Sequence, residues 1–247
     1  MTRLFTFGCS FTNYRWSTWA DCLAPEFDYF ENWGQQGSGN HYIFNSVVEA
    51  NLRHQFTEGD TVVVCWTNFY REDRYFKNKW QKFVYDDPKV KNFVDVYVDE
   101  RGCLIRDLAM MSAVHSLLSN KPKINWKFLS MCDITKDDLW ADNDTIHQDV
   151  AALYQPAISN VLPSFRSVLR PLGWGGPSPD WIKTRNYDPH PNPQEHLDYI
   201  DTVLPGWITK QTTRDLIAEE TALLETNKYE LKNHKPFRNG MCDIKRL

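Results

Sequence analysis

Apolar and polar positions along the chain follow two alternating patterns. Short apolar runs predict four strands, at residues 3–7, 27–33, 61–66 and 124–131. The run TVVVCW is continuous and follows the turn residues EGD, which is typical of a strand buried on both faces. Apolar residues at helical spacing predict helices at 16–24, 41–56, 108–118, 193–205 and 211–231, and a broken helical pattern over 146–170.

The order of these elements predicts the fold class. Strands that alternate with helices favour a parallel sheet with helices on both faces, an α/β sandwich. We expect one domain over residues 1–247, which ends in a helix and tail at 211–247. The charged and aromatic segment 70–104 does not fit a compact connection, so we expect an insertion there. It is either a lid or partner surface, or a surface excursion without function.

Composition narrows the classes of function. The chain has 247 residues, of which 42% are hydrophobic and 24% are charged, as in an ordinary globular protein. A net charge of −4 gives no drive toward nucleic acid or an anionic membrane, and we expect neither as a partner. The start MTRLFTF enters a strand pattern directly, so we expect a cytoplasmic protein. Its six scattered cysteines, without a CxxC motif, indicate reduced thiols.

Polar segments follow the predicted strands. In an open parallel sheet, ligands bind beyond the carboxyl ends of the strands. Gly8-Cys9-Ser10 follows the first strand, NWGQQGSGN the second and Thr67-Asn68 the third, and YDPHPNPQEH stands later at 187–196. Together they offer a hydroxyl, glycine amides, a carboxamide and an Asp/His pair. These are the parts of an acyl-transfer site: a nucleophile, a base, an orienting acid and oxyanion donors.

Four blocks within these segments carry a family resemblance. GCSFT (8–12), NWGQQG (32–37), CWTN (65–68) and DPHPN (188–192) stand in this order. They resemble the Gly-Asp-Ser-x-Thr, Asn-x-Gly-x-x-Gly, Gly-x-Asn-Asp and Asp-x-x-His-Pro blocks of the SGNH (GDSL-type) hydrolases. The resemblance implies a flavodoxin-like α/β sandwich and the activity of an esterase, lipase, thioesterase or carbohydrate O-acetylesterase, with no cofactor and no metal.

The resemblance also implies site residues. It places the nucleophile at Ser10, the base at His190 and the orienting acid at Asp188. The oxyanion donors would be the amides of Ser10 and Gly37 and the side chain of Asn68. A serine hydroxyl needs such a base to become nucleophilic, and the oxyanion needs donors that already point at it.

The blocks depart from the family pattern at several positions. Cys9 stands where the family has Asp, and Cys65 and Phe69 replace the Gly and Asp around the third-block Asn. Asp188 lies two residues before His190 rather than three. Another group, Asp180 or a backbone carbonyl, therefore remains an alternative for orienting the imidazole.

Each candidate also has a simpler interpretation. Ser10 could be a helix N-cap, which is common for Ser, and Asn68 a plain turn residue. Cys9 is an alternative nucleophile and His196 an alternative base. A metal site is a further alternative, although its members fit no standard ligand spacing: Asp188, His190, Glu195 and His196.

The sequence thus favours a serine ester hydrolase that cleaves a short acyl ester, such as an O-acetyl group on a carbohydrate. An acyltransferase with the same residues and a non-catalytic binding module on this fold are the alternatives. The chain has ten tryptophans, which serve either core packing or sugar stacking. Trp174 and Trp181 stand near the last block and are the candidates for contacting a sugar or acyl group, together with aromatic residues of 70–104.

Overall fold

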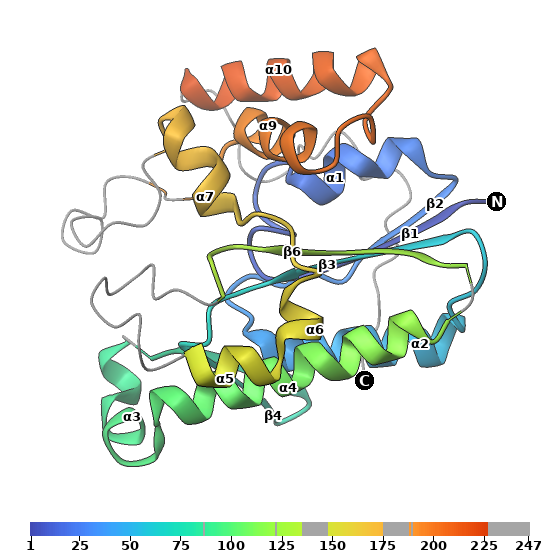
Figure 1. The fold of residues 1–247 in the computed structure, drawn as a ribbon. Helices are drawn as coiled ribbons and strands as arrows, with labels where there is room; N and C mark the ends of the chain where they lie inside the picture. The colour runs from blue at the N-terminus through green and yellow to red at the C-terminus, as the bar shows by residue number, and fades with distance from the viewer. Residues whose placement is uncertain (86, 122, 135–147, 175–187, 189, 227–247) are drawn as a thin grey trace.

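The centre of the protein is a four-stranded parallel sheet (Figure 1). The computed structural model describes residues 1–85, 87–121, 123–134, 148–174, 188 and 190–226. Its strands are β1 (Arg3–Phe7), β2 (Tyr29–Asn32), β3 (Asp60–Trp66) and β6 (Asn125–Ser130), in the spatial order β2-β1-β3-β6. The predicted α/β class with a central parallel sheet is confirmed.

The register brings the carboxyl ends of the strands to one edge. Thr6 of β1 lies opposite Asn32 of β2, and Phe7 lies opposite Val64 of β3. An isolated parallel bridge between Phe128 and Val161 continues the sheet beyond β6. The segments that leave β1, β2 and β3 therefore start side by side.

Two layers of helices cover the sheet (Figure 1). One face carries α1 (Trp19–Leu23), α7 (Phe165–Leu169), α9 (Pro193–Val203) and α10 (Gln211–Glu225). The other carries α2 (Asn40–His54), α4 (Glu100–Ser119), α5 (Gln148–Leu153) and α6 (Gln155–Ile158). Short 3₁₀ turns lie at Ala24–Glu26, Pro88–Val90 and Arg170–Leu172. No described helix is long and apolar enough to span a bilayer.

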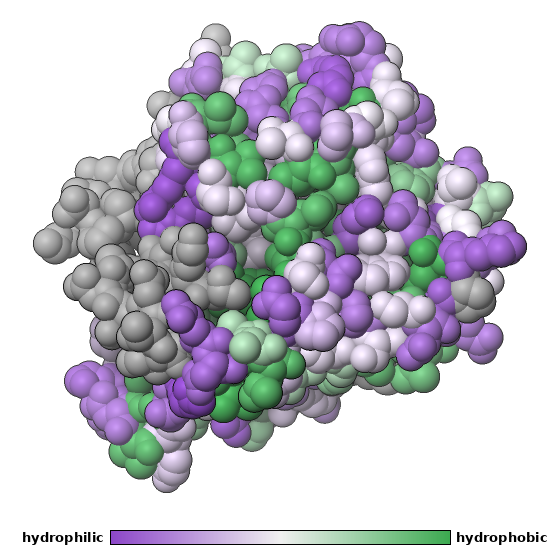
Figure 2. All heavy atoms as spheres, viewed as in Figure 1, coloured by the Kyte–Doolittle hydropathy of each residue, from purple (hydrophilic) through white to green (hydrophobic). Residues whose placement is uncertain are grey.

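Strand periodicity divides the core between the two layers. Successive side chains of a strand point to opposite faces. Leu4 of β1 and Val63 of β3 belong to the core under α1 and α9, whereas Phe5 and Val64 belong to the core under α2 and α4. All seven residues of β3 are buried, as its continuous apolar run predicts. Figure 2 shows hydrophilic residues over the outer helices and hydrophobic residues between the two layers.

The segment predicted as an insertion is partly regular. It forms an antiparallel hairpin, β4 (Arg71–Phe76) and β5 (Lys79–Val84), followed by α3 (Lys91–Tyr97). Trp80 of the hairpin packs edge-on against His41 and Tyr42 at the start of α2. The hairpin thus lies against the body of the protein.

Several helix boundaries differ from the predicted ones because capping residues set them. α4 begins at Glu100 rather than 108, since the Asp99 side chain accepts a hydrogen bond from the Gly102 amide. α1 begins at Trp19 rather than 16, since Thr18 and Asp21 form a capping box before it.

Candidate active site

The turn after β1 presents Ser10 at the carboxyl edge of the sheet. The chain reverses directly after Phe7, and the Thr12 amide donates to the Cys9 carbonyl over 3.0 Å. Gly8 permits this reversal, because a Cβ at that position would lie 2.0 Å from Thr12 Oγ1 and 3.0 Å from the Cys65 carbonyl oxygen. A larger residue at position 8 would therefore clash with Thr12 unless part of the turn shifted.

Ser10, His190 and Asp188 form a continuous hydrogen-bonded chain. Ser10 Oγ lies 2.8 Å from His190 Nε2, and His190 Nδ1 lies 2.6 Å from Asp188 Oδ1. The same Asp188 oxygen accepts the backbone amide of His190 at 3.1 Å. The two-residue spacing from Asp188 to His190 is therefore sufficient for the carboxylate to reach the ring.

Tyr14 supports this chain from one side and was not anticipated from the sequence. Its hydroxyl donates to Asp188 Oδ2 at 2.5 Å. Its ring stacks on the imidazole of His190, with centroids 3.9 Å apart and planes inclined by 20°. No local pattern marks Tyr14, because its partner lies 174 residues away in the chain.

The hydrogen bonds keep Asp188 ionised. Burial alone would raise the pKa of Asp188, but the bonds from His190 and Tyr14 outweigh it and hold the pKa below its usual value. Burial raises the pKa of Tyr14, and the bond to Asp188 raises it further. Tyr14 is thus a neutral donor at neutral pH, and Asp188 is a carboxylate that can orient and stabilise an imidazolium.

The segment that follows His190 is fixed by two sets of contacts. Trp16 Nε1 donates to the Pro191 carbonyl at 2.7 Å. Directly after it, Asn192 and Glu195 form the capping box that starts α9. The imidazole is therefore held between the turn after β1 and the first turn of a helix.

The predicted oxyanion residues lie on two segments that are joined by Asn40. Gly37 lies in the loop between β2 and α2, at φ +76°, and Asn68 follows β3. The Asn40 side chain donates to the Thr67 carbonyl and accepts from the Thr67 amide, both at 2.9 Å. This pair of bonds links the Gly37 loop to the residue before Asn68.

Asn32 joins the Gly37 loop to the turn that carries Ser10. Its Nδ2 donates to the Thr12 carbonyl at 2.7 Å, and its Oδ1 accepts the Gly34 amide at 2.9 Å. The Gln35 amide adds a bond to the Gly8 carbonyl at 3.0 Å. Hydrogen bonds thus connect the turn that carries Ser10, the Gly37 loop and the segment that carries Asn68.

The structure shows the surroundings of three residues that had simpler or alternative interpretations. Ser10 is not a helix N-cap, because α1 starts nine residues further on, at Trp19, with Thr18 as its cap. Cys9 is fully buried in the core on the α1 side of the sheet. His196, in α9, is also fully buried and lies against Phe11 and Phe165.

The metal-site interpretation finds no support among the described residues. No group of three or more His, Cys, Asp or Glu side chains there could hold a metal ion. Glu195 instead accepts the Asn192 amide at 2.7 Å in the capping box. Cys9, Cys22, Cys65 and Cys103 are free and buried, in line with the expected reduced thiols. Cys132 is also buried, and Cys242 lies outside the described residues.

The aromatic residues proposed for substrate contact have different positions. Trp174 is only 4% exposed and packs edge-on against Phe11, so it belongs to the core beneath the Ser10 turn. Trp181 and the alternative acid Asp180 lie outside the described residues. Of the aromatic residues in the hairpin, Tyr75 is half exposed.

A cavity of about 570 Å³ lies apart from these residues, between the hairpin and the α3–α4 segment. It is lined by Glu72, Arg74, Tyr85, Phe93, Tyr97, Val98, Asp99, Gly102, Cys103 and Arg106. None of the candidate catalytic residues lines this cavity.

Comparison with known proteins gives a distant structural similarity. No protein-family model and no curated protein matches the chain. Among solved structures, it is similar to a member of the lipolytic protein G-D-S-L family from Veillonella parvula DSM 2008, with 13% identity and a TM-score of 0.45. The match covers 83% of this chain and 98% of that one.

Proposed function

We propose that the protein is a serine ester hydrolase of the SGNH (GDSL) type. The observation that carries the proposal is the chain of hydrogen bonds from Ser10 Oγ through His190 to Asp188, with lengths of 2.8 and 2.6 Å. This arrangement provides a nucleophile, a general base and a group that fixes the tautomer of the base.

In the proposed reaction, Ser10 Oγ attacks the ester carbonyl carbon while His190 Nε2 takes the hydroxyl proton. Asp188 holds Nδ1–H and stabilises the imidazolium. The amides of Ser10 and Gly37 and the side chain of Asn68 donate to the oxyanion. The imidazolium then protonates the leaving alcohol, and a water molecule, activated by the same imidazole, hydrolyses the acyl-enzyme.

A short acyl group is the substrate feature that the surroundings of Ser10 favour. Ser10 is 6% exposed, and Phe11, which follows it, is 3% exposed. A nucleophile with so little exposed surface is easier for a small acetyl group to approach than for a bulky acyl group. We propose a small-molecule or carbohydrate ester as the substrate, with no metal or cofactor in the reaction.

Hydrolysis of a chromogenic acetyl ester tests the proposal. Ser10→Ala and His190→Ala should each lose at least about 1000-fold in kcat, since nucleophile and base act as a unit. The matched controls Ser159→Ala and His115→Ala change residues of other segments and should keep wild-type activity. Equal activity in Ser10→Ala and the wild type would contradict the proposal. Acyl transfer to an added sugar in excess of hydrolysis would indicate that the protein is an acyltransferase instead.

A further inference from the structure

The β4–β5 hairpin contacts the Gly37 loop on both sides of Gly37. Arg71 Nη1 donates to the carbonyl of Ser38 at 3.0 Å. Lys82 Nζ donates to the carbonyl of Gln36 at 2.7 Å. The two residues that flank Gly37 are therefore each held by a cation of the hairpin, one from each strand.

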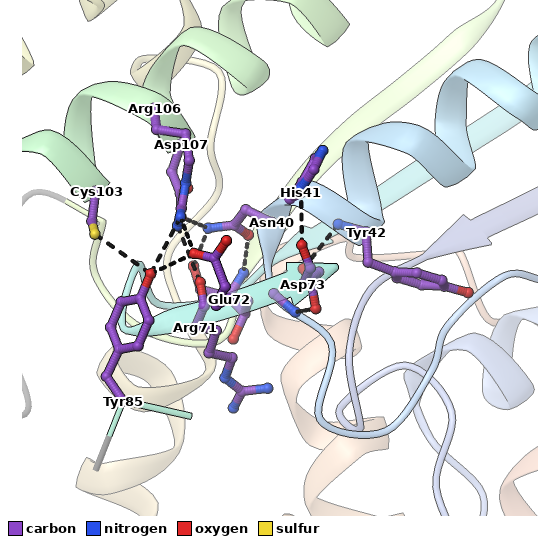
Figure 3. A network of polar contacts seen from close by, with 12 residues as sticks. Asn40, His41, Tyr42, Arg71, Glu72, Asp73, Tyr85, Cys103, Arg106 and Asp107 are labelled. Atoms are coloured by element: carbon purple, nitrogen blue, oxygen red, sulfur yellow. Dashed lines mark hydrogen bonds and ion pairs between the residues drawn. The ribbon is translucent and has the colours of Figure 1, made fainter. Parts of the chain in front are cut away.

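The hairpin also closes the N-terminus of α2, which follows the loop (Figure 3). Asp73 accepts the amides of Gly39 and Tyr42, each at 2.9 Å, and thereby caps α2 in place of a local residue. Asp73 is 1% exposed. A Cβ at Gly39 would lie 2.8 Å from Asp73 Oδ2 and 2.9 Å from Arg71 Cβ, so the hairpin is packed directly on the loop.

A partly buried polar network also fixes the hairpin (Figure 3). Arg106 of α4 donates to Glu72 at 2.9 Å, to the Arg71 carbonyl at 3.1 Å and to Asp107 at 2.7 Å. Asp107 in turn accepts from the Asn40 side chain at 2.7 Å. Asn40 is the residue that binds the backbone of Thr67, next to Asn68. The network thus runs from the hairpin to both segments that carry the predicted oxyanion donors.

From these contacts we infer that the β4–β5 hairpin positions the oxyanion donors of the Ser10 site, with Arg71 and Lys82 as positioning residues. The inference rests on the proposed ester hydrolase function. Preorganised donors stabilise the transition state only when they already point at the place where the charge develops. Gly37 is in a loop without local α-helical or strand structure, so its orientation depends on what holds its neighbours.

The kinetic test uses Lys82→Met and Arg71→Met, which keep the apolar stem and remove the donor. Each should lower kcat for an acetyl ester by about tenfold and leave KM nearly unchanged, since the oxyanion exists only in the transition state. Lys82→Arg should restore most of kcat. Lys79→Met and Arg74→Met, on the exposed side of the same hairpin, are the matched controls and should retain wild-type kcat.

Hydrogen–deuterium exchange separates this inference from the proposed function. The amides of Ser38 and Gly39 donate to the Gln35 carbonyl and to Asp73. They should exchange about tenfold faster in Lys82→Met and Arg71→Met, and at the wild-type rate in the control variants. Unchanged exchange, or unchanged kcat in an active enzyme, would overturn the inference. Faster exchange in a protein that hydrolyses no ester would support the role of the hairpin in holding the Gly37 loop. It would contradict the proposed esterase function.

Discussion

The contact between Tyr14 and Asp188 gives a quantitative prediction. Tyr14→Phe removes one hydroxyl, and with it the 2.5 Å hydrogen bond to Asp188, while the ring can still stack on His190. The substitution therefore tests the hydrogen bond alone. Tyr97→Phe, at a residue that is 75% exposed in α3, is the matched control.

The size of the effect follows from the exposure of the carboxylate. A hydrogen bond to a charged group contributes about 1.5–3 kcal/mol. The Asp188 side chain is 32% exposed, so water can replace part of the lost bond. We therefore expect about half of that range, roughly 0.7–1.5 kcal/mol, which corresponds to a loss of about 3- to 12-fold in kcat/KM. The loss should appear in kcat, because Asp188 stabilises the imidazolium that forms during the reaction.

Steady-state hydrolysis of a chromogenic acetyl ester measures this effect. An unchanged kcat/KM in Tyr14→Phe, or a loss that Tyr97→Phe shares, would refute the reasoning. A second readout comes from stability. The pKa of Asp188 is lowered in the folded protein, so its stabilising effect is present above its unfolded pKa of about 3.9 and is lost as the pH falls through the folded value. The stability difference between wild type and Tyr14→Phe should accordingly shrink in acid.

Two further predictions concern stability. Burial raises the pKa of Asp73 and of Asp107 to about 6, so the folded state favours their protonated forms, and their contribution to stability falls as the pH rises from about 4 to about 6. Urea unfolding measures the free energy of unfolding of wild type and Asp73→Asn at several pH values. The stability of the wild type relative to the variant should increase as the pH falls toward 4, and a pH-independent difference would contradict the assignment. Leu4→Ala, at a fully buried core residue of β1, should cost about 2–5 kcal/mol, whereas Leu52→Ala, at a residue 73% exposed in α2, should cost less than about 0.5 kcal/mol; equal costs would contradict the described core.

The sheet was predictable because its strands are marked locally. TVVVCW is apolar throughout since both of its faces are covered, and its observed bounds differ from the predicted ones by a single residue, Asp60. The hairpin was not predictable in the same way. Its strands are largely exposed or half-buried, so charged and aromatic residues mix without a clear alternation of apolar and polar positions.

The candidate site likewise contains residues that the local sequence marks and residues that it does not. Ser10, Gly37, Asn68 and His190 stand in short blocks at the ends of predicted elements, where their types alone suggest acyl transfer. Their catalytic roles remain a prediction. Tyr14 and Asn40 carry no such mark, because their contacts with Asp188 and Thr67 exist only after distant segments pack together. Residues that act through such long-range contacts can be identified only from the structure.

The most direct test of the account is the site at which a fluorophosphonate reacts with the intact protein. Ser10 Oγ should displace fluoride and form one phosphonate ester, located on the Ser10 peptide by mass spectrometry, because His190 Nε2 lies 2.8 Å away to accept the proton. The adduct should be absent from Ser10→Ala and strongly slowed in His190→Ala. A wild-type protein that forms no adduct, or an adduct that persists in Ser10→Ala, would contradict the serine hydrolase mechanism.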